Sequence, residues 1–186
     1  TMSISENNFD YGRVSDVVGS SLSGITDGKL VRIAQLDKDK FVMAYKGEDG
    51  DGFVSTFSIS NYPDFKTTNT TEFETASADV ISICAISDTH SFIAYENHGV
   101  TPKRCYVKVV DDSASVVSIL NHDSAISGRG KYNAVCKIDN THIALVYGGG
   151  EFDYVYLKIF SIDGAYAITE ESSTLLEEVT PYDINI

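Results

Sequence analysis

The sequence contains no tryptophan, and proline, cysteine and methionine are scarce, with 3, 3 and 2 residues among 186. No apolar run approaches the roughly 20 residues that a transmembrane helix needs, so we expect no membrane span. No CxxC pair or Cys/His spacing typical of a zinc site is present. Basic residues are also few. The 14 Lys and Arg against 27 Asp and Glu give a net charge of −13, and such a surface disfavours nucleic acid as a partner.

Helical periodicity is missing as well, because apolar residues do not recur at spacings of three and four over any stretch. Hydrophobic residues make up 42% of the chain, and the aromatic residues are mostly Tyr (11) and Phe (9). This balance suits half-buried sheet surfaces, so we expect an all-β fold. The three cysteines cannot all pair within one chain. Cys84, Cys105 and Cys136 are interpreted as small buried hydrophobic residues.

A repeat of about fifty residues is the main feature of the sequence. Three segments align without gaps, and each ends in a tyrosine: AQLDKDKFVMAY (34–45), CAISDTHSFIAY (84–95) and CKIDNTHIALVY (136–147). Each segment reads as an apolar strand, a polar turn and a second apolar strand. Asp, Asn and Ser in the turns bond nearby backbone and tolerate turn dihedrals. The repeat therefore predicts three equivalent β-hairpins, while a β-sandwich with accidental similarity is the alternative.

Two further strands are expected in each repeat. Third strands are predicted at 53–59, 106–110 and 154–160, and weaker, more polar fourth strands at 71–75, 115–120 and 167–176. Four strands of falling hydrophobicity are typical of a propeller blade, whose outer strand faces water. We therefore predict one β-propeller domain with whole blades at 29–78, 79–130 and 131–178.

The two ends of the chain resemble parts of a further blade. Ser3-Ile4-Ser5 resembles the end of the first repeat's third strand (58–60), and residues 181–186 resemble a first strand at 131–136. We expect residues 1–28 to supply outer strands and 179–186 an inner strand of a split fourth blade. Three arrangements remain open, namely closure within one molecule, pairing between two molecules in a homo-oligomer, and a piece of a longer propeller.

With the hairpin pattern in view, the chain resembles propeller-type repeat arrays with a turn followed by an F-V-x-A-Y core. Such arrays are common in predicted surface and secreted proteins of marine bacteria and in phage structural proteins. The resemblance covers roughly residues 28–186 and rests on hydrophobic residues and a turn. It implies an extracellular, cell-surface or virion component for binding or assembly, and it supplies no catalytic residue.

In a propeller, the loops from strand two to strand three share one face, where ligands generally meet the protein. The candidate ligand residues expected at this face are Tyr45, Glu48, Asp49, Asp51, Tyr95, Glu96, His98, Tyr147, Glu151 and Asp153. The three tyrosines are predicted either to stack on sugars or to pack between blades.

No cofactor is expected, with calcium as the one exception. The oxygen density of Glu48, Asp49 and Asp51 suits this hard cation, although the spacing of an EF-hand loop is missing. Solvated turn residues explain the same segment equally well, so both interpretations stay open.

These features favour a non-catalytic binding or assembly module with a glycan or protein partner. No Ser-His-Asp elbow, carboxylate-pair motif or cofactor loop is present. One alternative is a glycan-processing enzyme, a glycosidase or lyase that uses acidic loop residues. The other is a purely structural component of an oligomer.

Overall fold

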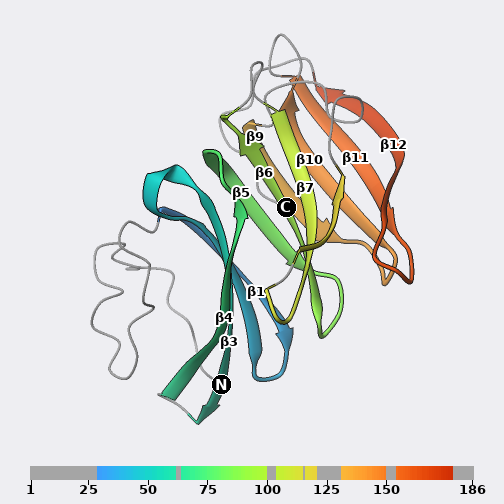
Figure 1. Cartoon of the computed structure of the whole chain (residues 1–186). Helices are drawn as coiled ribbons and strands as arrows, with labels where there is room; N and C mark the ends of the chain where they lie inside the picture. Colours follow the sequence, from blue (N-terminus) through green and yellow to red (C-terminus); the bar gives the residue numbers. More distant parts are fainter. Residues whose placement is uncertain are drawn as a thin grey trace, which may run out of the picture.

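The computed structural model describes residues 29–61, 64–99, 104–114, 116–120, 131–149 and 154–177. These residues form twelve β-strands, one short 3-10 turn η2 (Glu48–Gly50) and no α-helix, which confirms the all-β prediction (Figure 1). Sheet 1 contains β1 (Lys29–Asp37), β2 (Lys40–Lys46), β3 (Gly52–Asn61) and β4 (Asp64–Glu74). Sheet 2 contains β5 (Ala78–Ala85), β6 (His90–Asn97), β7 (Arg104–Asp111) and β8 (Val116–Leu120). Sheet 3 contains β9 (Lys131–Lys137), β10 (His142–Gly149), β11 (Tyr154–Ile162) and β12 (Ile168–Glu177).

Each sheet is an antiparallel four-stranded meander whose strand order follows the chain. The three predicted hairpins are confirmed, because Ala34 pairs with Val42, Cys84 with Phe92 and Cys136 with Ala144. The predicted third and fourth strands are also present, with bounds that differ by a few residues, most at β4.

The sheets lie side by side in an open series, and the described residues form no closed ring (Figure 1). The inner strand β5 of sheet 2 packs between the inner strands β1 and β9 of its neighbours. The predicted split blade, residues 1–28 and 179–186, lies outside the described residues.

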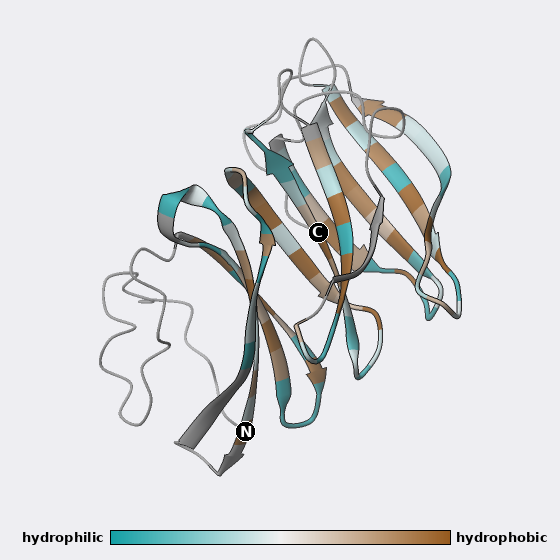
Figure 2. Cartoon of the chain, viewed as in Figure 1, coloured by the Kyte–Doolittle hydropathy of each residue, from teal (hydrophilic) through white to brown (hydrophobic). Residues whose placement is uncertain are grey.

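Two hydrophobic cores hold the series together, one between each pair of neighbouring sheets. Strand β6 contributes side chains to both cores, because successive side chains of a strand point to opposite faces. Ile93 and Tyr95 pack in the core shared with sheet 1, whereas Phe92 and Ala94 pack in the core shared with sheet 3. Figure 2 shows brown, hydrophobic bands along the middle strands of the sheets.

A local backbone feature repeats with the sheets. Leu30, Val80 and Tyr132 take φ values of 56°, 48° and 53° at equivalent positions near the start of each first strand. The strand register is irregular at each of these places. Each first strand therefore carries a bulge with one residue in the left-handed region, which β-branched and bulky residues rarely adopt.

Candidate functional site

The stacked sheets have two opposite edges, which we name by their connections. The turn edge carries the tight hairpin turns between first and second strands, at residues 38–39, 86–89 and 138–141. The loop edge carries the connections between second and third strands and contains the predicted ligand face.

The three repeat tyrosines at the loop edge are buried, with exposed fractions of 2% for Tyr45, 0% for Tyr95 and 1% for Tyr147. Each ring stacks on the aromatic ring directly opposite in the third strand, with centroid distances of 5.6–5.8 Å. Burial raises the pKa of all three phenols. Because the rings are covered by protein, this arrangement agrees with the packing interpretation and offers no face for sugar stacking.

The hydroxyl groups of two of these tyrosines have polar side-chain partners. The Tyr45 hydroxyl lies 3.4 Å from Ser55 Oγ, and the Tyr95 hydroxyl donates to Glu74 Oε2 at 2.6 Å. Lys108 Nζ lies 3.6 Å from the same carboxylate oxygen and 5.3 Å from the centre of the Tyr95 ring. Burial lowers the pKa of Lys108, while Glu74 opposes that shift. The contacts of Glu74 with Tyr95 and Lys108 connect sheet 1 with sheet 2.

The acidic loop that was predicted to suit calcium forms the short turn η2. Asp49 is exposed and takes a left-handed φ of 57°, whereas Asp51 is partly buried. The side chain of Glu48 and the whole of Glu151 and Asp153 lie outside the described residues. In the described part of the chain, no group of three His, Cys, Asp or Glu residues is arranged to hold a metal ion. Calcium binding stays a prediction.

Glu96 and His98, also predicted at this face, belong to a cluster of charges that joins sheets 1 and 2. His98 Nδ1 lies 3.1 Å from Asp79 Oδ2, and His98 Nε2 lies 2.9 Å from Glu96 Oε2. Lys46 Nζ completes the cluster from β2, at 2.7 Å from Asp79 Oδ1. The Glu96 side chain is buried, and its Oε1 has no hydrogen-bond partner. The two carboxylates approach different nitrogens of one imidazole ring, so they do not converge on a common ligand position.

A cavity of about 520 Å³ opens at the other edge, where the hairpins of the three sheets meet. It is lined by residues from all three sheets: Leu36, Ala85, Ile86, Ser87, Asp88, Lys137 and Asn140. Leu36, Ala85 and Ile86 provide an aliphatic wall. Asp88, Lys137 and Asn140 provide a carboxylate, an ammonium and an amide. We call this site the turn-edge cavity.

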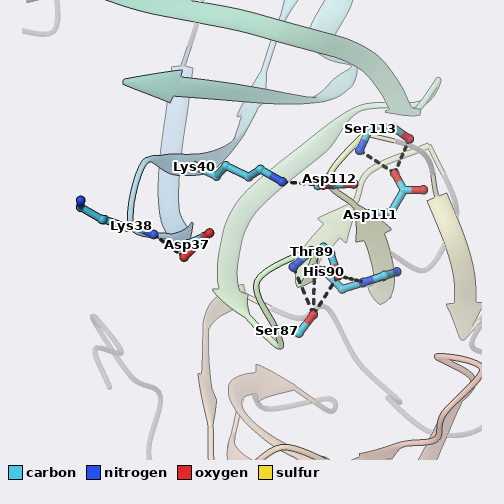
Figure 3. Close-up of polar contacts among 9 residues, drawn as sticks. All are labelled: Asp37, Lys38, Lys40, Ser87, Thr89, His90, Asp111, Asp112 and Ser113. Atoms are coloured by element: carbon cyan, nitrogen blue, oxygen red, sulfur yellow. Dashed lines mark hydrogen bonds and ion pairs between the residues drawn. The ribbon is translucent and has the colours of Figure 1, made fainter. Parts of the chain in front are cut away.

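The walls of the turn-edge cavity are held by short local contacts. Ser87 Oγ accepts hydrogen bonds from the backbone amides of Thr89 (3.3 Å) and His90 (3.1 Å), which fixes the β5–β6 turn (Figure 3). Lys137 Nζ donates to the backbone carbonyl of Ile86 at 2.5 Å and so connects sheet 3 to sheet 2. Figure 3 also shows Lys40, which bonds Asp112 Oδ2 at 3.0 Å and connects sheet 1 to sheet 2. The contact of Lys137 with Ile86 therefore joins two sheets at the cavity itself.

The sequence analysis placed candidate ligand residues at the loop edge only and missed the turn-edge cavity. Lys38, Asp88 and Asn140 occupy the same position in the three aligned turns, and two of them line the cavity. The available signal for this cavity was one polar turn position, which is lysine in the first repeat, aspartate in the second and asparagine in the third. Its meaning depends on how closely the three hairpins approach one another, which the sequence does not specify.

No protein-family model matches the chain, and no curated protein matches its sequence. None of the described residues belongs to a helix that is long and apolar enough to cross a lipid bilayer.

Proposed function

We propose that this protein is a non-catalytic binding and assembly module of a cell surface or virion, and that the turn-edge cavity binds a hydroxyl-rich ligand such as a glycan. The turn-edge cavity is the observation that carries the proposal. Its volume of about 520 Å³ lies within the range of small-molecule sites, which combine apolar walls with a few polar groups.

The polar groups of the cavity suit hydroxyl groups. The Asn140 amide both donates and accepts, the Asp88 carboxylate accepts, and the Lys137 ammonium donates. Asp88 and Asn140 are exposed and stand on turns, where a ligand reaches them without opening a core. The aliphatic wall matches the apolar face of a sugar ring.

A glycan-processing enzyme is a weaker match to the same cavity. Glycosidases use two carboxyl groups about 5–10 Å apart, whereas Asp88 is the single carboxylate among the residues that line this cavity. The binding function therefore suits the cavity better than the enzymatic alternative.

The binding proposal is tested by a glycan array, followed by calorimetry on the sugars that bind. Asn140→Leu should weaken binding at least tenfold, because it replaces a hydrogen-bonding group by an apolar one. Asn69→Leu, on the exposed part of β4, is the matched control and should leave binding unchanged. No binding on the array, or equal losses in both variants, would overturn the proposal.

We further propose that the open series of sheets is completed to a propeller by the split blade. Tyr95 and Tyr147 each pack in the core shared with the preceding sheet. Tyr45 lies on the opposite face of β2 from Val42 and Ala44, which pack against sheet 2. A preceding sheet is therefore expected at this face, and residues 1–28 with 179–186 are proposed to supply it.

Native mass spectrometry separates closure within a monomer from closure in an oligomer. Deletion of 179–186 should lower the melting temperature in either case, and an unchanged melting temperature contradicts the proposal.

A further inference from the structure

We infer that the turn-edge cavity selects a zwitterionic ligand, a small molecule with one carboxylate and one ammonium group, such as an amino sugar acid. This inference rests on the proposed binding function and specifies the class of ligand. It assigns the ligand carboxylate to Lys137 and the ligand ammonium to Asp88.

The first observation is that the cavity holds two opposite charges that do not neutralise each other. Asp88 and Lys137 both line it, yet they form no ion pair with one another. Lys137 Nζ is held instead by the carbonyl of Ile86. An ammonium group has three donors, so two N–H groups remain for an acceptor in the cavity.

The second observation is that the surroundings of Asp88 favour a cation. Asp88 acts electrostatically on His90, as do Asp111 and Asp112. Three carboxylates therefore act on this region, and Lys40, which pairs with Asp112 and also acts on Asp88, offsets part of their charge. A ligand ammonium at Asp88 would enter a negative local field, which the net charge of −13 reinforces over longer distances.

The third observation is the aliphatic wall that lines the same cavity as the two charges. Leu36 comes from sheet 1, and Ala85 and Ile86 come from sheet 2. Apolar groups beside a charge reduce the local screening by water, so each ion pair with the ligand is stronger than at an open surface. A cavity of this volume accommodates a single sugar ring with both charged substituents.

The inference is tested by calorimetry with four six-carbon sugar probes that share one ring and differ at the amine and at C6. Glucosaminuronic acid carries both charges, N-acetylglucosaminuronic acid only the carboxylate, glucosamine only the ammonium, and N-acetylglucosamine neither. We expect the zwitterion to bind about tenfold more tightly than either singly charged probe, since charge-assisted hydrogen bonds add to each end.

Two variants test which cavity residue binds which charged group of the ligand. Lys137→Gln should weaken the binding of glucosaminuronic acid and N-acetylglucosaminuronic acid about tenfold and leave the binding of glucosamine unchanged. Asp88→Asn should weaken the binding of glucosaminuronic acid and glucosamine about tenfold and leave the binding of N-acetylglucosaminuronic acid unchanged. Unfolding curves of both variants establish that they fold.

The outcomes separate this inference from the proposed function. If all four probes bind with equal affinity and Asn140→Leu abolishes their binding, the inference of a zwitterionic ligand is overturned. The proposed glycan site would then still stand. Binding of none of the probes, with no hit on the glycan array, would overturn both. Tighter binding of the zwitterion without any effect of Lys137→Gln or Asp88→Asn would also overturn the inference.

Discussion

At the scale of single residues, the bulges of the first strands are the feature that the repeat keeps despite changing residue types. Leu30, Val80 and Tyr132 share a left-handed φ, although none of the three residue types favours it. A residue other than glycine in this region costs about 1–2 kcal/mol. The bulge geometry is therefore set by the packing of the sheets rather than by local preference.

We predict that Leu30→Gly destabilises the protein less than Ile33→Gly, a glycine at a position of the same strand with an ordinary φ. Leu30 is 38% exposed and Ile33 57%, so from burial alone Leu30→Gly would be the costlier variant. Glycine adopts a positive φ without a steric penalty, which offsets about 1 kcal/mol of the burial lost at Leu30. The free energy of unfolding in urea measures both variants. A larger loss of stability in Leu30→Gly than in Ile33→Gly would contradict the interpretation of strain.

A second prediction concerns Asp139 in the β9–β10 turn. A hydrogen bond from the Thr141 backbone amide and the contact with His142 hold the pKa of Asp139 at about 2, below its ordinary value. A carboxyl group whose pKa is lowered by folding stabilises the folded state at pH values above its unfolded-state pKa of about 3.9. This contribution is lost as the pH falls towards 2. Asp139→Ala should therefore lower the melting temperature at neutral pH, and the difference from the natural protein should shrink between about pH 4 and pH 2.

The control for this pH profile is Asn140→Ala in the same turn. Asn140 does not titrate, so its effect on the melting temperature should stay constant over this pH range. A difference for Asp139→Ala that persists unchanged at pH 2 would exclude the proposed contribution.

At the scale of elements, the alternation of apolar and polar residues predicts where a strand lies, but it does not predict which face of that strand is buried. In β11 the apolar residues Val155, Leu157 and Ile159 alternate with Tyr156 and Lys158. A reading from hydrophobicity alone would turn the apolar set inwards. Lys158 is nevertheless buried, with Nζ 2.8 Å from both carboxylate oxygens of Glu170. The burial of a lysine depends on a partner from another strand, which strand patterning does not identify.

The loop edge could be predicted as a place where charges gather, but not as an ion-pair cluster between sheets. The positions of Glu96 and His98 at the end of β6 predict them at this edge. Asp79, which completes the cluster, pairs with Glu96 from the neighbouring strand β5. Lys46 comes from β2, so its contact with Asp79 depends on the packing of sheet 1 against sheet 2.

We predict that the acidic residues of this cluster contribute unequally to the free energy of unfolding. Asp79→Asn should cost about 1–3 kcal/mol, because it weakens the contacts with Lys46 and His98. Glu96→Gln should change stability by less than about 1 kcal/mol or stabilise, since it removes a buried charge whose Oε1 lacks a donor. Urea unfolding of both variants at one pH measures the two values. Equal costs would contradict this assignment.

At the scale of the whole molecule, the cysteines report whether neighbouring sheets stay packed. Burial raises the pKa of Cys84 and of Cys105 to about 12, and Cys105 is completely buried in the core between sheets 2 and 3. The interpretation as a small buried core residue is confirmed for Cys105, whereas Cys84 and Cys136 are only partly buried.

We predict that Cys84 and Cys105 resist a thiol reagent at pH 8 in the native protein. At that pH a thiol with a pKa of about 12 is a thiolate in only about one molecule in ten thousand. In denaturant, all three cysteines should react. Mass spectrometry of peptides after alkylation identifies the modified residues, and Cys105→Ala confirms the assignment. Rapid native alkylation of Cys105 would show that sheets 2 and 3 separate readily.

The direction in which the repeat tyrosines point gives the molecule a polarity. Each internal interface joins the tyrosine face of one sheet to the small-residue face of the sheet before it, where Ala44 and Ala94 lie. Among the residues that the structure describes, sheet 1 ends the series with a tyrosine face and sheet 3 ends it with the opposite kind. These two ends are complementary to each other rather than self-complementary. If neighbouring copies supply each other's split blade, the contact is head-to-tail, and copies of this chain would join into a ring of two or more when the rotation closes and into a filament when it does not.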